Sequence, residues 1–393
     1  MSERQVHDTP PIALTNSLHE TIVRVRTNPL TWSLRRKWTV TLLSTLATFT
    51  TLWNATIITV AHNPIGEEFH ISDANFPNSY WLVTSWTIGG AIFTLMVLPL
   101  LEDFGMRTGF LATHIAFILL NVPQALAPNY ATLVVFRFFA GGCATVLANT
   151  AASVIGNVWK EEHERTIPMS MYVTAYLAGI GMGPVVGAAV LQSLNWRWIN
   201  WVQMIIHAAL FPIYYFFYEE SRNTAITEQV LGNSTDEISV ERTVRPISFS
   251  RRFATSIKRP LHMLITEPVL LVFTLWSAFS VGAVYVFTQS TEQVFGAIHD
   301  WTAIQSGYVQ AAVVIGSCIG GSAAYISSKF YAASARRNRE NPGKPIPEAR
   351  LYMSVIGSIV GVSGGMFIYG WTSYHKDSWL APTVGLVLVG GFE

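Results

Sequence analysis

Apolar residues are gathered along the chain into long runs that short polar segments separate. A helix needs about 20 apolar residues to cross the hydrocarbon core of a membrane. Nine runs meet this requirement, and each predicts a membrane-spanning helix: Trp38–Ala61, Tyr80–Leu101, Gly109–Ala127, Thr132–Val158, Met169–Leu191, Trp198–Tyr218, Pro268–Thr288, Ile304–Ser327 and Leu351–Trp371. A tenth run, Trp379–Phe392, is too short for a full span, so we expect the chain to end inside a helix.

Lys and Arg residues are concentrated in every second connection between the predicted spans. Such residues gather on the cytoplasmic side, so we predict a multi-pass protein with a cytoplasmic N-terminus. The long basic connection after the sixth span divides the chain in two. The expected parts are a cytoplasmic tail (1–37), a six-span bundle (38–218), a cytoplasmic linker (219–264) and an incomplete bundle of three spans and part of a fourth (265–393).

This pattern predicts an all-α membrane protein with two bundles, a plan in which many transporters hold substrate between the halves. Composition agrees, because charged residues are 12% and hydrophobic residues 50% of the chain. The net charge of +1 gives no reason to expect nucleic acid as a partner. We find no phosphate-binding loop, zinc-ligand spacing or catalytic motif, so we predict neither a cofactor, nor a metal, nor an enzyme. Cys143 and Cys318 lie in apolar runs and predict no disulfide.

The fifth predicted span contains an unusual run of glycines with one proline. Gly179, Gly183 and Gly187 recur at four-residue spacing, which makes one smooth helix face, and Pro184 lies among them. In lipid such a helix is stable only where neighbouring helices satisfy the backbone group that proline frees. These residues favour a membrane transporter. The alternative is a plain helix-packing seam.

Arg137 lies a short way inside the fourth predicted span. A guanidinium in hydrocarbon costs several kcal/mol, so we expect it to face a water-filled cavity or a partner and to have a functional role. The alternative is that it reaches the outer interface. For His114 and His207 we favour neutral packing over proton relay. The predicted spans contain no Asp or Glu away from their ends, which argues against proton coupling.

Glu102, Asp103, Gly105 and Arg107 join the second and third predicted spans in a very short turn. Glycine permits the tight bend, and the charged residues can pair across the helix ends as a latch between two conformations. The alternative is an ordinary solvated turn.

Several polar or aromatic side chains lie inside the predicted spans and are candidates for a substrate cavity. They are Asn54, Trp86, Asn149, Tyr172, Tyr176, Gln289 and Gln310. Together they suggest a lipophilic, partly polar ligand. The alternative for any one of them is an interhelical hydrogen bond, which contributes about 0.6 to 2 kcal/mol.

Several short motifs occur in order and resemble those of the major facilitator superfamily, and more closely those of the fungal twelve-span drug:proton antiporter family. They are Leu98–Arg107, Arg137–Gly141, Gly179–Ala188, Asn195–Trp198, Glu219–Arg222 and Pro347–Leu351. In the loop motif, Leu98 and Met106 depart from the family's pattern. The resemblance extends from about Arg36 to the last residue.

The resemblance implies a rocker-switch exporter of small lipophilic compounds, drugs or secondary metabolites, which exchanges them for protons at the plasma membrane. It assigns proton coupling to Arg137 and gating to the glycine run and to the turn at Glu102. We expect a monomer whose partners are the lipid bilayer, the substrate and protons. The alternatives are a truncated membrane protein without transport activity and an uncoupled facilitator.

Overall fold

The computed structural model describes residues 28–72, 78–160, 162–221, 249–338, 346–374 and 378–392. The regular elements in these ranges are all helical, as predicted. Nine of the described helices are long and apolar enough to cross a membrane, and each corresponds to one predicted run. The chain is therefore a multi-pass membrane protein.

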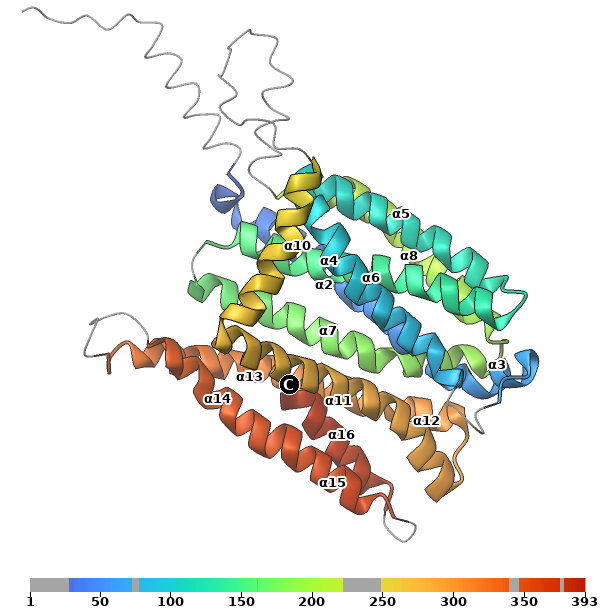
Figure 1. Ribbon diagram of the computed structural model, residues 1–393. Helices are drawn as coiled ribbons and strands as arrows, with labels where there is room; N and C mark the ends of the chain where they lie inside the picture. The colour runs from blue at the N-terminus through green and yellow to red at the C-terminus, as the bar shows by residue number, and fades with distance from the viewer. Residues whose placement is uncertain are drawn as a thin grey trace, which may run out of the picture.

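The first half of the chain forms one bundle, drawn from blue to yellow-green in Figure 1. Its long helices are α2 (Leu34–Thr56), α4 (Trp81–Phe104), α5 (Met106–Ala125), α6 (Tyr130–Val158), α7 (Glu162–Leu191) and α8 (Arg197–Phe217). Short elements extend them: η1 (Pro29–Thr31), η2 (Thr59–Ala61), α3 (His62–Phe69) and η3 (Asn78–Tyr80). Helix α6 lies at the centre, because it packs against α2, α4 and α5.

The second half forms a smaller bundle, drawn from orange to red. It contains α11 (Pro268–His299), α12 (Ala303–Val309), α13 (Ala311–Ser334), η4 (Pro347–Arg350), α14 (Leu351–Ile356), the π-helical η5 (Gly357–Ser363), α15 (Gly364–Thr372) and α16 (Leu380–Phe392). Helix α16 packs against α13 and α15. Among the described residues this bundle has three full spans and the short α16, against six spans in the first bundle.

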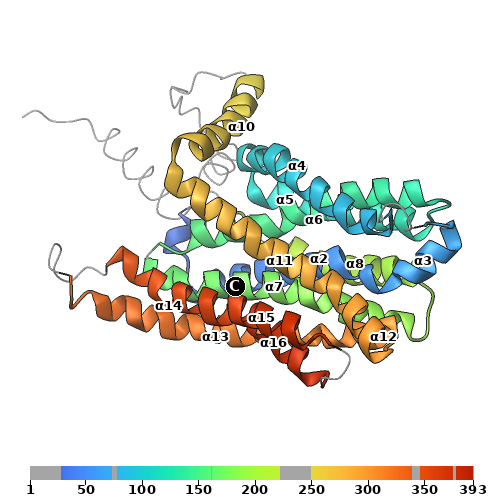
Figure 2. The same cartoon turned by 60° about the horizontal axis from the view of Figure 1, so that its bottom comes forward.

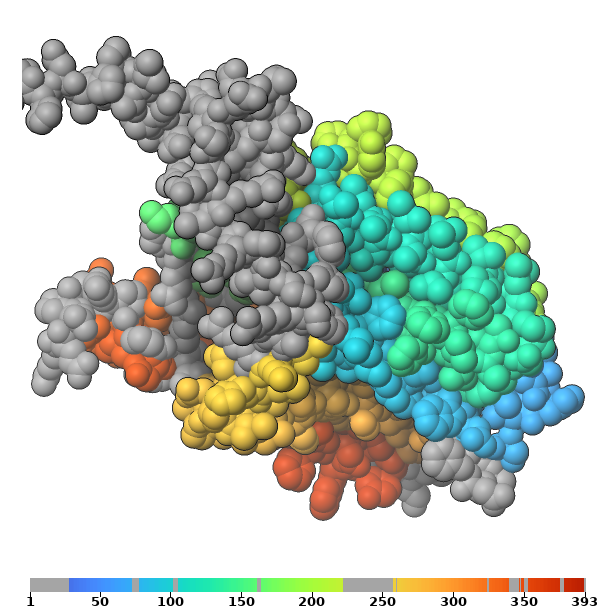
Figure 3. All heavy atoms as spheres, turned by 45° about the horizontal axis from the view of Figure 1, so that its top comes forward, coloured from blue at the N-terminus to red at the C-terminus, as the bar shows by residue number. Residues whose placement is uncertain are grey.

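Helix α10 (Phe249–Thr266) precedes the second bundle and packs beside α4. Figure 3 shows the described side chains of its second half, in yellow, beside those of α4, in blue. It occupies part of the predicted linker, of which residues 222–248 lie outside the described ranges. The predicted boundary at 264 stays a prediction.

Helices α2 and α11 each end at a different residue from the predicted span. Helix α2 ends at Thr56, and the chain turns at Ile57 and Ile58 before η2 begins. Helix α11 continues past the predicted end at Thr288, through the polar run Gln289–Gln293, to His299, and it ends at Asp300, which takes a left-handed φ of 53°. The longer helix includes Glu292, so the expectation of spans without an internal acidic residue does not hold for α11.

The two bundles meet along α7, which packs against α2 in its own bundle and against α12 and α13 of the second. Helix α11 also lies beside α7, as Figures 1 and 2 both show. We call the end of the bundles that carries Arg36, Arg107, Arg165 and Lys329 the basic end, and the opposite end, where α3 and α12 lie, the α3 end. Which end faces the cytoplasm stays a prediction.

Candidate transport site between the bundles

The glycines of α7 lie against α2 at backbone distance. A Cβ atom added to Gly179 would lie 2.9 Å from the Phe49 carbonyl oxygen. At Gly183 it would overlap backbone atoms of Trp53, and at Gly187 the carbonyl oxygen of Ile57. The predicted smooth face therefore exists, and its neighbour is α2 of the same bundle.

Pro184 lies within this seam. It lacks the N–H that would bind the carbonyl oxygen of Ile180, four residues earlier. Thr56 at the end of α2 donates its hydroxyl to that oxygen instead, at 2.6 Å.

The other face of α7 touches the second bundle. The Pro184 carbonyl oxygen and the Ala188 methyl group would each lie 2.9 Å from a Cβ atom on Gly307 of α12. A Cβ atom on Gly181 would lie 3.0 Å from Val313 of α13. Segment Gly179–Ala188 thus joins a packing seam on one side to the contact between the bundles on the other.

Further contacts close the α3 end. The Tyr308 hydroxyl donates to the Gln192 side-chain oxygen at 3.2 Å, which links α12 to the end of α7. The Gln293 amide of α11 donates to the hydroxyl of Tyr80, at the start of α4. At this end the bundles are in contact through small residues and side-chain hydrogen bonds.

Arg137 is fully buried, with an exposed fraction of 0%, so it does not reach the interface. Its Nε donates to the Leu82 carbonyl oxygen at 2.7 Å, and one terminal nitrogen donates to the carbonyl oxygens of Asn54 and Ala55 at 3.1 and 3.0 Å. Those two carbonyls are in the last turn of α2, where a helix leaves acceptors without a partner. The guanidinium also lies 4.8 Å from the centre of the Trp86 ring. Arg137 therefore ties α2 and α4 to α6.

The other terminal nitrogen of Arg137 has no hydrogen-bond partner among the described residues. Tyr285 of α11 lies within electrostatic range of this arginine and of Tyr176. The Tyr285 ring packs against three separate apolar clusters that contain residues of the first bundle. Tyr285 is therefore a side chain of the second bundle that reaches toward Arg137.

Four of the predicted cavity residues make contacts inside a bundle. Asn54 donates to Asn121 at 3.3 Å, and Asn149 donates to Thr94 at 3.3 Å. Trp86 is buried against Arg137. Gln310 donates to the carbonyl oxygens of Phe287 and Thr288 at 3.4 and 3.2 Å.

The other three lie where the bundles approach each other. Tyr172 and Tyr176 are edge-to-face at a centroid distance of 6.2 Å on α7. The amide nitrogen of Gln289 is buried and has no partner among the described residues. Tyr285 and Glu292, on the same helix as Gln289, were missed by sequence reasoning. Their spacing of three or four residues from Gln289 is the signal that could have found them.

A cavity of about 640 Å³ lies between α7 and the helices α13, α14 and α16. Its volume suits a drug-sized ligand. The polar side chains in its wall come from both bundles: Arg165, Thr166, Ser170, Thr174, Ser317, Ser327, Ser328, Tyr331 and Ser354. None of the seven predicted cavity residues lines it. The Arg165 guanidinium already uses some of its N–H donors, because it donates to the carbonyl oxygens of Gly156 and Trp159 at the end of α6.

The turn between α4 and α5 consists of Gly105 alone, which has a φ of 102° that favours glycine. The side chains of Glu102 and Asp103 lie outside the described part of the chain. The carboxylate of Glu220 accepts hydrogen bonds from the backbone N–H groups of Met106 and Arg107, at 3.2 and 2.9 Å. A carboxylate there satisfies free donors at the positive end of the α5 dipole. The latch role of the turn stays a prediction.

His114 and His207 form a buried pair between α5 and α8. His207 Nε2 lies 3.1 Å from the Thr50 carbonyl oxygen, and His114 Nε2 lies 3.0 Å from His207 Nδ1. A carbonyl only accepts, so His207 carries its proton on Nε2 and His114 must donate to Nδ1. Both rings are thus hydrogen-bonded in the neutral form, and His114 Nδ1 has no partner among the described residues.

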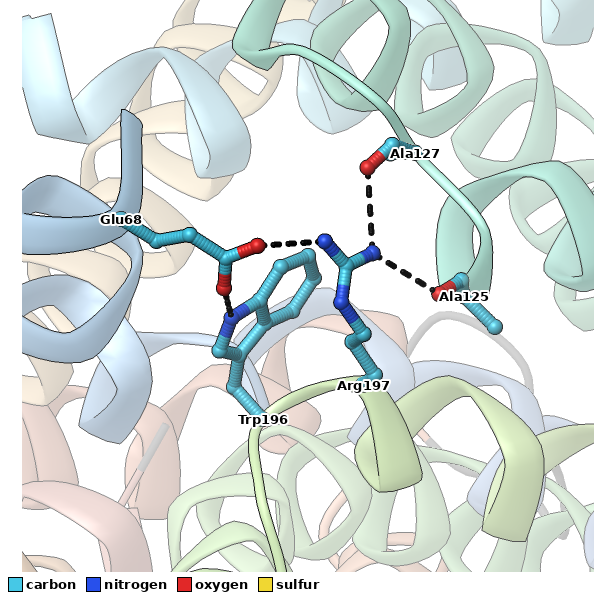
Figure 4. Close-up of polar contacts among 5 residues, drawn as sticks. All are labelled: Glu68, Ala125, Ala127, Trp196 and Arg197. Carbon is cyan, nitrogen blue, oxygen red and sulfur yellow. Dashed lines mark hydrogen bonds and ion pairs between the residues drawn. The ribbon is translucent and has the colours of Figure 1, made fainter. Parts of the chain in front are cut away.

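A clasp at the α3 end holds three segments of the first bundle together, as Figure 4 shows. The Glu68 carboxylate accepts from Trp196 Nε1 at 2.6 Å and pairs with Arg197. Arg197 also donates to the carbonyl oxygens of Ala125 and Ala127, at 3.1 and 3.0 Å. Its guanidinium lies 4.5 Å from the Trp196 ring centre. The clasp fixes α3 against the ends of α5 and α8.

The described residues contain no group of three or more His, Cys, Asp or Glu side chains placed to hold a metal ion. Cys143 is buried and Cys318 is exposed, and neither is in a disulfide.

The fold and the sequence are similar to those of known transporters. An uncharacterized transporter of Schizosaccharomyces pombe is 27% identical over 384 residues, which cover 93% of this chain and 75% of the relative. The MFS-type transporter hepF of Aspergillus oryzae is also 27% identical, over 93% of this chain and 75% of its own. The structure of the xylose transporter XylE from E. coli, in a partially occluded inward-open conformation, matches with a TM-score of 0.63. The match covers 91% of this chain and 82% of the XylE chain at 16% sequence identity. At that identity it shows a shared fold alone.

The family's sequence profile covers nearly all of the chain. The profile of the Major Facilitator Superfamily matches residues 43–392, which include every predicted span in whole or in large part. The all-helical two-bundle fold agrees with that match. This chain belongs to the major facilitator superfamily and is a transmembrane transporter.

Proposed function

We propose that the protein is a secondary active exporter of small lipophilic compounds, which works by rocker-switch alternating access. The contact of Gly181, Pro184 and Ala188 with α12 and α13 carries this proposal. Small residues on both sides let the bundles touch closely without interlocking, so this contact can open and re-form. Toward the other end a cavity of about 640 Å³ is lined by both bundles, which touch in its wall where Gly321 of α13 meets Thr174 of α7.

In this proposal the basic end faces the cytoplasm and the substrate enters there. The positive-inside rule supports that orientation, since Arg36, Arg107, Arg165 and Lys329 all lie at one end. The substrate binds between the bundles, near Tyr172, Tyr176 and Gln289, and is released when the α3 end opens. The protein acts as a monomer in the plasma membrane.

Export is proposed to be driven by protons, with Arg137 as a coupling residue. Arg137 links the end of α2 to α4, one of its terminal nitrogens has no partner among the described residues, and Tyr285 of the second bundle lies within electrostatic range of its guanidinium. A shift of Tyr285 during rocking changes the electrostatic surroundings of that nitrogen. The turn at Glu102, Asp103, Gly105 and Arg107 is proposed as the latch at the basic end.

The test is transport by the purified protein in liposomes. Rhodamine 6G serves as a lipophilic probe, and its movement is followed by fluorescence after a pH gradient is imposed. We expect movement against the probe gradient that collapses when a protonophore removes the pH gradient. Movement only down the probe gradient would identify an uncoupled facilitator. No movement in either condition, with a set of lipophilic probes, would exclude the exporter.

A further inference from the structure

One face of α11 carries three polar side chains in line. Tyr285, Gln289 and Glu292 are separated by four and three residues, which places them on one side of a helix. Phe287 is buried on another side, in an apolar cluster of the second bundle. Because Tyr285 packs against apolar clusters of the first bundle, the polar line faces the space between the bundles.

Glu292 is the unexplained member of this line. It is half-buried in a candidate span, yet no Lys, Arg or His of the described residues lies within ion-pair distance of its carboxylate, and no described group donates a hydrogen bond to it. An isolated carboxylate inside a membrane is expensive, so such residues mark ligand or ion pathways. A cationic group on a ligand would give Glu292 the partner that the described residues do not supply.

The rest of the line indicates what kind of cation fits. The buried amide nitrogen of Gln289 has no acceptor among the described residues, so a ligand oxygen can accept from it. Tyr285, one turn before Gln289 on α11, and Tyr176 of α7 supply aromatic surface beside it. From Tyr285 to Glu292 the helix rises about 10 Å, roughly the length of a drug-sized molecule. The site is thus apolar and aromatic at one end and anionic at the other.

We propose that this face of α11 binds amphiphilic organic cations, with Glu292 as the residue that selects for positive charge. The cationic group lies at Glu292, toward the α3 end, and the lipophilic part lies against Tyr285 and Tyr176. The inference rests on the proposed function, since it names the substrate class of that exporter. It concerns binding, however, and can be tested without transport.

The experiment compares two lipophilic probes of similar shape, one positively charged and one neutral. Tetraphenylphosphonium is a lipophilic cation, and triphenylphosphine oxide is a neutral molecule with a hydrogen-bond acceptor. Equilibrium binding of each radiolabelled probe to the purified full chain in detergent is measured for the wild type and for Glu292→Gln. We expect the substitution to weaken tetraphenylphosphonium binding about tenfold while triphenylphosphine oxide binding changes less than about twofold.

Two further variants control for folding and for charge in general. Glu292→Asp keeps the carboxylate and should retain the preference for the cation. Glu267→Gln removes an exposed carboxylate at the start of the same helix and should change neither affinity. Equal weakening of both probes by Glu292→Gln, no weakening of either, or no saturable cation binding by the wild type would overturn the inference. Glu292-dependent binding without transport would instead count against the exporter alone.

Discussion

The hydroxyl of Thr56 donates a 2.6 Å hydrogen bond to the carbonyl oxygen of Ile180, the acceptor that Pro184 cannot bind. Both residues are fully buried, so water cannot replace the bond. A proline in the middle of α7 is therefore stable because α2 supplies the missing donor. The same approach of the two helices needs Gly183, whose absent side chain leaves room for Thr56.

Replacing Thr56 with Val should lower the free energy of unfolding by about 1 to 2 kcal/mol, because the Ile180 carbonyl loses its partner while the shape is kept. Unfolding in detergent micelles, followed by circular dichroism, measures the change. Thr87→Val is the matched control, since Thr87 is exposed on α4 and bonds only within its own helix. Equal effects of the two substitutions would show that the bond to Ile180 contributes nothing.

Gly183→Ala should destabilise the first bundle by about 1 to 3 kcal/mol, because the added methyl group overlaps backbone atoms that cannot move aside. Gly156→Ala in α6 is the control. Nothing lies within 4 Å of a Cβ atom at Gly156, so alanine there should be neutral or stabilise the helix by up to about 1 kcal/mol. Thermal unfolding of both variants in the same detergent compares them, and a stable Gly183→Ala protein would contradict the seam.

Arg137→Lys keeps the charge but loses the planar fork that reaches carbonyl oxygens on two helices. We expect a loss of about 1.5 to 3 kcal/mol of stability for each charged hydrogen bond that lysine cannot make. We also expect weaker proton-driven flux in liposomes. Arg336→Lys, at an exposed position after α13, is the control for the exchange itself. Unchanged flux in Arg137→Lys would remove the coupling role proposed for Arg137.

The buried histidine pair predicts a non-additive result. His207→Leu leaves the Nε2 donor of His114 without its acceptor, and His114→Leu leaves the Nδ1 acceptor of His207 without its donor. Each single substitution should cost about 1 to 3 kcal/mol. The double substitution should cost about 0.5 to 3 kcal/mol less than the sum, which a double-mutant cycle on thermal stability measures. Simple additivity would mean that the two rings are not coupled.

The clasp at the α3 end predicts a local effect. Glu68→Ala removes the acceptor for Trp196 and the partner of Arg197, so the amides of α3 should exchange with deuterium faster. Global stability should fall by no more than about 1 kcal/mol, because the pair is partly exposed. Glu67→Ala is the matched control, since that neighbouring side chain is exposed. Mass spectrometry of peptides that contain α3 measures the deuterium uptake of both variants.

Much of this fold follows from the order of apolar and polar residues. Hydropathy alone predicts nine spans because a lipid-facing helix must be apolar along its whole length. The glycine spacing of α7 predicts close packing, since a helix face without side chains lets another backbone approach. It does not predict that α2 is the neighbouring helix, because this depends on tertiary contacts.

The candidate site was less predictable. Arg137 binds backbone carbonyls, which every residue has, so no sequence pattern marks its partners. Asn54 and Asn149 have the polarity expected of cavity residues and nevertheless bond inside the first bundle. The predicted span ended at Thr288, so Glu292 was not considered as a residue inside it. The helix continues for another 11 residues, from 289 to 299. A polar residue near a span end needs the true helix length before it can be interpreted.

The two faces of α7 place different demands on sequence variation. The face of Gly179, Gly183 and Gly187 meets backbone, so no change in a neighbouring side chain can make room for a larger residue there. On the other face, Gly181 meets the Val313 side chain, and a larger residue can be accommodated if Val313 becomes smaller. Among diverging relatives we therefore expect the first three positions to stay fixed and positions 181 and 313 to vary together.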